Sequence, residues 1–237
     1  MFRIVVPVLV LALVCGARAA DDKPVEPFNG KDLKGWKLKD EKKSKWQATS
    51  LNLTLDAKNP GQFADLTGAT NTVLVPAMLV NAKSGGCDIS TEEKFGDIHL
   101  EVEFMVPKGS NSGIYVMGEY EVQILDSFGK ADDKLTQGDL GALYSAAKPP
   151  KNASKKPGEW QKFVIDFQAP KFDAAGKKTA NAKFVKVVLN DIVLHENVEM
   201  KQHTPGGLTG KEAATGPLMF QGDHGPVAFR NIKIVKK

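Results

Sequence analysis

The chain has 237 residues, of which 42% are hydrophobic and 25% charged, and its formal net charge is +4. That length suits one all-β domain, and lysines that are scattered rather than gathered in a stripe give no sign of nucleic-acid binding. The chain has two cysteines, Cys15 and Cys87. We expect Cys15 to be removed with an N-terminal signal, which leaves Cys87 without a partner for an intrachain disulfide. The stability of the fold then comes from its core, and Cys87 is interpreted as a small buried thiol.

Residues 1–19 have the features of a cleaved secretion signal. Arg3 precedes an apolar run at 4–14, and Ala17-Arg18-Ala19 has the small-x-small pattern of a cleavage site. The apolar run is shorter than the ~20 residues that span a bilayer. We therefore expect residues 20–237 to form one secreted or periplasmic domain, a monomer with no membrane span.

Apolar and polar residues alternate along much of the remaining chain, which is typical of β-strands. The clearest strand is 97–106, where every second residue from Ile98 to Val106 is apolar. Further strands are predicted at 114–117, 120–126, 162–168, 182–189, 218–221 and 227–235. Asn190-Asp191 predicts a tight hairpin, because both residues tolerate positive φ. The pattern favours an all-β fold of two packed antiparallel sheets.

A first polar cluster accompanies the strand predicted at 120–126. Glu121 and Gln123 share one face of it, and Asp126 lies at its end, with Asn111 in the polar loop before it. A carboxylate beside an amide can bind sugar hydroxyls, and Asp126 can supply or orient a second carboxylate. Periodicity alone equally allows Glu121 and Gln123 to face water on an outer sheet.

A second polar cluster lies near the C-terminus, among glycines that let a ligand approach the backbone. It contains Gln221, Asp223, His224 and Arg230. His224 is suited to proton transfer near neutral pH, and Arg230 to stabilising an oxyanion. The alternatives are an ordinary turn at 223–226 and an Arg230 that pairs structurally with an acid such as Glu121.

Several other residues are weaker candidates for a site. Tyr144 can hydrogen-bond a ligand and Trp160 can stack on a sugar, although such aromatics are more often core. The long loops expected at 126–140 and 148–159 are where specificity usually resides. His99 and His195 are interpreted as structural.

No motif predicts a metal or a cofactor. His-x-Glu-x-x-His spacing, paired cysteines, a glycine-rich phosphate loop and a Gly-x-Ser-x-Gly elbow are all missing from the sequence. We therefore expect no cofactor, with a structural calcium ion left open because oxygen ligands need no sequence signature.

Six segments in order resemble the 3-keto-disaccharide hydrolase family, also described as 3-keto-glucoside lyase/hydratase domains. They are 28–36, 109–115, 120–127, 141–144, 157–160 and 216–232. The resemblance runs from about Pro27 to Val235. It implies a concanavalin- or laminin-G-like jelly roll at a bacterial envelope, acting on a carbohydrate oxidised to a ketone at carbon 3.

The resemblance also implies a chemistry in which a base removes the acidified proton at carbon 2, the group at carbon 1 departs, and water adds back. On this basis Glu121 and His224 share the proton transfers. Arg230 and Asn111 hold the ketone or enolate oxygen. The expected substrate-positioning residues are Gln123, Asp126, Tyr144, Gln221 and Asp223.

Two alternatives remain open. One is direct hydrolysis by two carboxylates, Glu121 with Asp126 or Asp223. The other is a carbohydrate-binding or adhesion module without catalysis, because laminin-G-like sandwiches often only bind.

Overall fold

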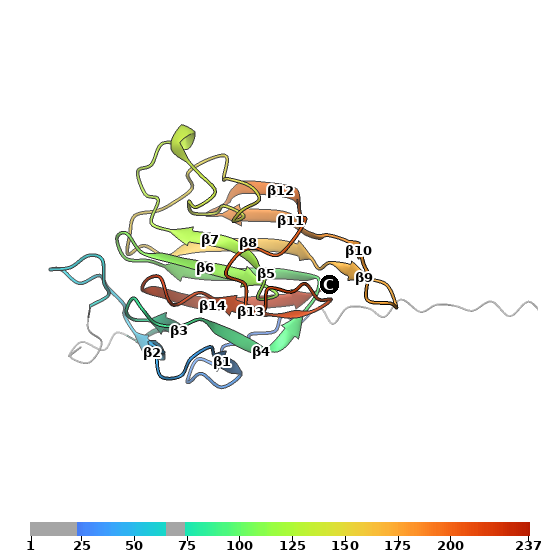
Figure 1. Ribbon diagram of the computed structural model, residues 1–237. Coiled ribbons are helices and arrows are strands. Elements are labelled where there is room, and N and C mark those ends of the chain that lie inside the picture. The colour runs from blue at the N-terminus through green and yellow to red at the C-terminus, as the bar shows by residue number, and fades with distance from the viewer. Residues whose placement is uncertain (1–22, 65–73) are drawn as a thin grey trace, which may run out of the picture.

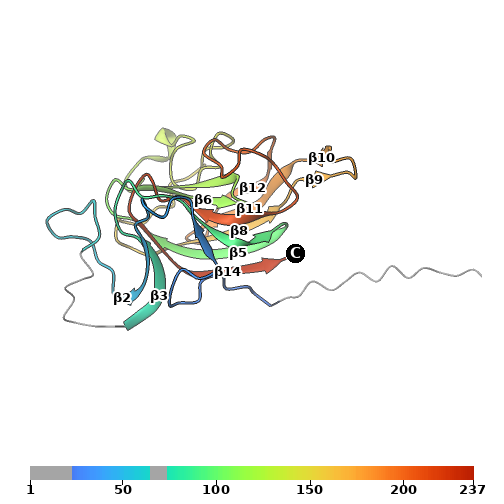
Figure 2. The same ribbon diagram turned by 60° about the horizontal axis from the view of Figure 1, so that its bottom comes forward.

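The computed structural model describes residues 23–64 and 74–237, so the predicted signal at 1–19 lies outside the described residues. Neighbouring strands pair antiparallel in two stacked sheets (Figures 1 and 2). The five-stranded sheet consists, in spatial order, of β1 (Trp36–Leu38), β4 (Ile89–Phe95), β13 (Gly216–Phe220), β6 (Asn111–Val116) and β7 (Tyr120–Leu125).

The second sheet has seven strands, and two short strands form a separate ribbon. In spatial order the seven are β12 (Ile192–Met200), β11 (Ala182–Leu189), β8 (Gln161–Gln168), β5 (Ile98–Met105), β14 (Val227–Lys236), β3 (Leu74–Asn81) and β2 (Trp46–Leu51). The ribbon pairs β9 (Lys171–Phe172) with β10 (Lys178–Ala180), and a 3-10 turn, η2, covers Asp132–Lys134.

Aromatic side chains join the two sheets. Phe220 of β13 stacks on Phe229 of β14, with ring centroids 3.8 Å apart. Trp36 stacks on Phe220, and Trp46 on Phe229, which extends the contact along the core. Because strand side chains alternate between faces, the sequence neighbours of these residues must point away from the core. Each sheet therefore has an inner, apolar face and an outer face.

The structure confirms the predicted antiparallel jelly-roll sandwich. The seven predicted strands correspond to β5, β6, β7, β8, β11, β13 and β14, with ends shifted by up to three residues. Asn190 and Asp191 have φ of 49° and 67° and form the turn between β11 and β12, as predicted. Cys87 is a buried free thiol, also as predicted.

The strands missed by the sequence pattern are β1 to β4, the short β9 and β10, and most of β12. In β3, Met78, Leu79 and Val80 are all buried, because the segment bearing Leu53 and Phe63 covers the outer face of this strand. A strand buried on both faces has a continuous apolar run instead of an alternating pattern. In β4 the middle residues are polar and exposed, so no alternation appears.

A loop at 203–210 is fastened to the turn between β6 and β7. The buried Glu119 carboxylate accepts hydrogen bonds from the backbone N and the hydroxyl of Thr209, at 2.8 and 2.6 Å. Thr204 N donates to Glu119 O at 2.8 Å, and the Thr204 hydroxyl accepts from Glu121 N at 3.1 Å. These bonds hold the loop against β7.

Within 23–64 and 74–237, no helix is both long and apolar enough to cross a bilayer.

Candidate active site

The outer face of the five-stranded sheet carries the first predicted cluster. Tyr120 and Val122 of β7 belong to the core between the sheets, so Glu121 and Gln123 point the other way. Strand register places Tyr115 of β6 opposite Glu121, and Gly113 opposite Gln123. Periodicity left open whether Glu121 and Gln123 form a site or face water on a solvated surface. Burial distinguishes the two, because Glu121 is only 3% exposed.

Glu121 is a buried carboxylate without a cationic partner. Among the described residues no lysine or arginine forms a salt bridge with it. Burial raises the pKa of Glu121 to about 7, even though Tyr115 and His224 act to lower it. A carboxyl group with this pKa exists in both protonation states near neutral pH, which suits it to accept and return a proton.

Gly113 makes room for the Glu121 carboxylate. A Cβ at Gly113 would collide with the carboxylate oxygen and would lie 3.1 Å from a ring carbon of Tyr115. The lack of a side chain in the middle of β6 therefore lets the carboxylate lie across the sheet surface.

Tyr115 supplies a hydroxyl beside this carboxylate. Burial, followed by the negative charge of Glu121, raises the pKa of Tyr115 far above its usual value. The hydroxyl therefore stays protonated and remains a hydrogen-bond donor, and it donates to Pro205 O in the 203–210 loop at 3.4 Å. Sequence reasoning missed Tyr115 as a site residue. Tyr115 and Glu121 are equally far along the chain from the turn between β6 and β7, so hairpin pairing could have predicted that they lie opposite each other.

The structure brings His224 and Asp223 to the same face. The turn that carries them is anchored by Asn81, whose Nδ2 donates to the carbonyls of Gly222 and Gly225 at 2.9 Å each. His224 Nδ1 lies 2.5 Å from Asp223 Oδ1, and the His224 side chain is half exposed. The charges of both residues act on the pKa of Glu121, His224 lowering it and Asp223 raising it. The His224 side chain therefore lies within electrostatic range of the Glu121 carboxylate.

Arg230 is not part of this site, so its predicted role is wrong. Phe229 faces the core, which directs Arg230 to the outer face of the seven-stranded sheet, on the opposite side of the sandwich. There Arg230 Nε donates to Glu103 at 2.7 Å, and its guanidinium lies 3.9 Å from the centre of the Trp160 ring. The structural alternative was right about Arg230, with Glu103 as the acid, and Trp160 is occupied by this stacking.

Asp126 is also absent from the cluster. Its carboxylate accepts backbone hydrogen bonds from Gly109 N at 2.8 Å and Phe128 N at 3.3 Å. It lies one residue beyond β7, where alternation directs its side chain away from the face of Glu121 and Gln123. Asp126 therefore holds the loops at this end of the sheet.

The predicted amides do lie on the outer face of the five-stranded sheet. Asn111 begins β6 on the side of Gly113 and Tyr115, and its buried Oδ1 has no hydrogen-bond partner among the described residues. Gln221 follows β13 beside Gly113, whose carbonyl accepts from Gln221 N at 3.0 Å. Together with Gln123 they give this face three amide side chains.

Tyr144 borders a polar cavity at the edge of β7. Its backbone N donates to Glu121 O at 3.2 Å. The cavity has a volume of about 430 Å³, and Tyr144, His203 and Thr204 are among the residues that line it. It is large enough to accommodate a small ligand.

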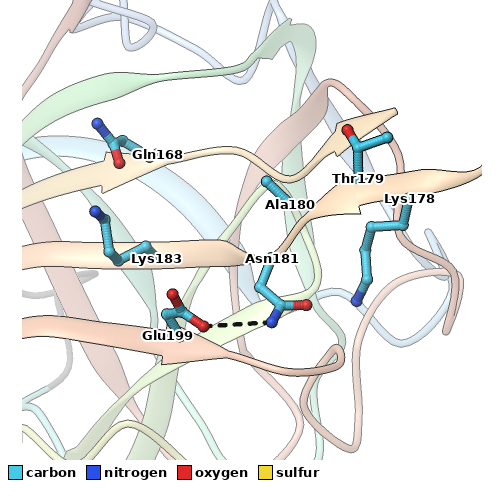
Figure 3. A pocket seen from close by; sticks show the side chains of 7 residues that line it. All are labelled: Gln168, Lys178, Thr179, Ala180, Asn181, Lys183 and Glu199. Atoms are coloured by element: carbon cyan, nitrogen blue, oxygen red, sulfur yellow. Dashed lines mark hydrogen bonds between the residues drawn. The ribbon is translucent and has the colours of Figure 1, made fainter. Parts of the chain in front are cut away.

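A second polar cavity, of about 440 Å³, lies away from these residues (Figure 3). Gln168, Lys183 and Glu199 lie side by side in it on β8, β11 and β12, and Asn181 Nδ2 donates to Glu199 at 3.4 Å. Because Ala182 and Phe184 face the core, Lys183 points outward from the seven-stranded sheet. This cavity contains none of the predicted site residues.

The remaining histidines are structural, as predicted. His195 is buried, and its Nε2 lies 2.9 Å from Gly141 O, while burial lowers its pKa. His99 Nδ1 lies 3.0 Å from Asp166. In the part of the chain that the structure describes, no group of three or more His, Cys, Asp or Glu residues could hold a metal ion.

Comparison with known proteins identifies the family. A family model described as 3-keto-alpha-glucoside-1,2-lyase-like domain matches residues 23–235. A crystal structure from Parabacteroides distasonis ATCC 8503, provisionally assigned as a glycosyl hydrolase, is 26% identical and covers 92% of this chain and 84% of its own, with a TM-score of 0.62. No curated protein matches the sequence.

A second structure from the same organism, with the same provisional assignment, is 17% identical and covers 91% of this chain and 94% of its own, with a TM-score of 0.57. At that identity it shows the fold alone. The family match and the 26% identical structure together support a carbohydrate-active enzyme. The family match also confirms the resemblance found in the sequence, and the chain belongs to the family of 3-keto-alpha-glucoside-1,2-lyase-like domains.

Proposed function

We propose that the outer face of the five-stranded sheet cleaves 3-keto-glycosides by elimination followed by hydration. The observation that carries this proposal is the buried Glu121, whose pKa is raised to about 7 by burial. The Tyr115 hydroxyl lies beside it, and the His224–Asp223 pair acts on it through charge. Membership of the 3-keto-alpha-glucoside-1,2-lyase-like family supports the substrate class.

In the elimination step, the deprotonated Glu121 takes the proton from carbon 2, which the neighbouring ketone has acidified. The electron pair moves toward the ketone oxygen, where the protonated Tyr115 hydroxyl donates a hydrogen bond to the developing enolate. The pair then forms the double bond between carbons 1 and 2 while the bond from carbon 1 to the leaving oxygen breaks. Protonated His224 gives that oxygen a proton.

In the hydration step, His224 takes a proton from water, whose oxygen bonds to carbon 1. While the alcohol leaves and water enters, the proton on Glu121 exchanges with solvent. The electrons of the double bond then take this solvent-derived proton from Glu121, which restores the bond to hydrogen at carbon 2. Both side chains return to their starting states, and the net reaction is hydrolysis to a 3-keto-sugar and an alcohol. Asp223 positions His224 through the 2.5 Å contact with Nδ1.

The amides of the same face bind the sugar in this proposal. Asn111, Gln123 and Gln221 offer both donors and acceptors to hydroxyl groups. The polar cavity at Tyr144 adjoins Glu121 at the edge of β7 and extends the surface available to the sugar.

The test is to incubate the protein with a set of 3-keto-glucosides and their unoxidised parents and to measure released alcohol. We expect cleavage of the 3-keto compounds only. Equal cleavage of the parents would favour direct hydrolysis by two carboxylates, with Glu121 and Asp223 as the pair on this face. Binding of the 3-keto compounds without cleavage would instead identify a carbohydrate-binding module.

We also propose that the protein acts after export, secreted or in the periplasm, on the strength of the signal-like sequence at 1–19. N-terminal sequencing of protein recovered outside the cytoplasm should begin at Ala20. An intact N-terminus in the cytoplasmic fraction would contradict export.

A further inference from the structure

We infer that an apolar hollow beside Tyr115 is the subsite for the leaving group, and that it selects an aglycone with an apolar ring over a second sugar. This inference rests on the proposed function. The apolar hollow is a cavity of about 180 Å³ on the outer face of the five-stranded sheet. Its apolar lining residues are Leu38, Ile89, Leu208 and Met219, and its polar ones are Lys37, Lys39, Asp88 and Ser90.

Strand register places the apolar hollow next to the catalytic residues. Ser90 of β4 lies opposite Met219 of β13, Met219 lies opposite Tyr115, and Tyr115 lies opposite Glu121. Neighbouring strands are about 4.8 Å apart, so Met219 is about 10 Å from Glu121, with Tyr115 between them. A sugar held at Glu121 would therefore direct its substituent either toward this hollow or toward the edge of β7.

The electrostatic evidence agrees with this position. Asp88, on the wall of the apolar hollow, acts through its charge to raise the pKa of both Tyr115 and Glu121. Asp88 therefore lies within electrostatic range of both side chains, in agreement with the strand register.

Two of the four polar residues that line the apolar hollow, Asp88 and Lys39, are paired. Asp88 Oδ2 accepts from Lys39 Nζ at 2.9 Å, and Asp88 Oδ1 accepts from Gly222 N at 3.2 Å. Among the described residues that line the hollow, this leaves the Ser90 hydroxyl and the Lys37 ammonium for the several hydroxyls of a second sugar, and unpaired polar groups are costly to bury. Met219 and Leu208 instead offer apolar contact.

The volume suits one ring. An apolar cavity of about 150 Å³ is known to bind benzene, so about 180 Å³ accommodates a six-membered ring. A further cavity of about 250 Å³ continues past Leu208, lined by Met117 and Pro217, and gives room for a longer aglycone. The polar cavity at Tyr144 lies at the opposite edge of the site, so the two ends differ in polarity.

The test compares methyl and benzyl 3-keto-glucosides, whose leaving alcohols have similar acidity, so that differences in kcat/KM report contacts with the ring. We expect the wild type to prefer the benzyl substrate by about tenfold, a typical gain for filling an apolar pocket. Leu208→Ala, which removes an apolar wall, and Ser90→Leu, which fills the hollow, should each reduce this preference to about twofold or less. Leu55→Ala is the matched control, because Leu55 is a half-buried leucine packed against the outer face of the seven-stranded sheet.

The outcomes separate the two claims. Equal kcat/KM for both substrates in the wild type, or equal losses on both substrates in Leu208→Ala and Ser90→Leu, would overturn the leaving-group subsite and leave the proposed function standing. Cleavage of neither substrate by the wild type would overturn the proposed function and this inference with it. Circular dichroism of each variant identifies any that fail to fold, and the Leu208 and Ser90 variants test the claim by opposite changes in volume.

Discussion

The two outer faces of the sandwich use the same residue type in opposite ways. Glu103 of β5 and Glu121 of β7 both alternate with core residues and point outward. Glu103 accepts hydrogen bonds from Arg230 and Asn231, at 2.7 and 2.9 Å, and although burial acts to raise its pKa, these bonds lower it. Within residues 23–64 and 74–237, no lysine or arginine pairs with Glu121, and its pKa rises to about 7.

This contrast shows how a carboxylate on a sheet becomes structural or reactive. A carboxylate that is paired with a cation, as Glu103 is with Arg230, stays ionised and stabilises the fold. One that is buried without a cation is poised to exchange protons, which is typical of active sites. The following predictions test whether this difference between the two faces is a difference in function.

Replacing the reactive carboxylate should have the largest effect. Glu121→Gln keeps the shape but cannot take up a proton, so kcat on a 3-keto-glucoside should fall about 1000-fold, within the range of general base catalysis. Glu103→Gln is the matched control and should change kcat less than twofold. Equal losses in the two variants would remove the distinction between the faces.

The same substitution should stabilise the protein at high pH. Since the pKa of Glu121 is raised in the folded state, its contribution to stability is complete below the unfolded value of about 4.3 and is lost as pH rises through about 7. Glu121→Gln should therefore be more stable than the wild type by about 3 kcal/mol at pH 8, and of similar stability at pH 4. Urea unfolding at both values measures this, and a pH-independent difference would contradict the assignment.

His224 should come next in effect. His224→Ala removes the proposed acid for the leaving oxygen, and kcat should fall about 100-fold. His99→Ala, an imidazole paired with Asp166 on the other outer face, serves as the control. Substrates with more acidic leaving alcohols should recover part of the lost rate, because they need less help to depart, and an unchanged dependence on the leaving group would argue against this role.

Crowding the Glu121 carboxylate should lower activity more modestly. Gly113→Ala places a Cβ where the carboxylate lies, so kcat should fall about tenfold as Glu121 is displaced. Gly138→Ala is a suitable control because its Cβ would meet its nearest neighbour at an ordinary 3.8 Å. Full activity of Gly113→Ala would mean that the position of this carboxylate is unimportant.

Arg230 should matter for stability alone. Arg230→Ala removes the ion pair with Glu103 and the stacking on Trp160, at a cost of about 1 kcal/mol in the free energy of unfolding, with kcat within twofold of wild type. Steady-state kinetics and thermal unfolding of one preparation measure both. A large loss of kcat at unchanged stability would restore Arg230 to the mechanism.

The fold was predictable where one face of a strand is covered and the other is not. Strand β5 shows this alternation clearly, whereas β3 is covered on both sides and β4 has a polar middle, so neither shows a period of two. Their pairing depends on contacts with segments distant in the chain, which local patterns do not encode.

The candidate site was predictable in part. Alternation within one strand placed Glu121 and Gln123 on one face but left open whether that face is a site, and the family resemblance suggested that His224 joins them. Arg230 could not be placed from the local sequence, because β13 and β14 are consecutive in the chain but belong to different sheets. Tyr115 could have been found by counting from the hairpin turn, whereas Asp88 joins the site only through long-range pairing of β4 with β13.

The most direct test of the central claim follows hydrogen at carbon 2 of the sugar. A 3-keto-glucoside is cleaved in deuterated water, and the product is examined by NMR, with preformed 3-keto-glucose incubated alone to measure exchange without the enzyme. Proton abstraction by Glu121 predicts deuterium at carbon 2 at the rate of cleavage, and neither cleavage nor enzyme-dependent exchange with Glu121→Gln. Cleavage by the wild type that leaves the original hydrogen at carbon 2 would contradict the account.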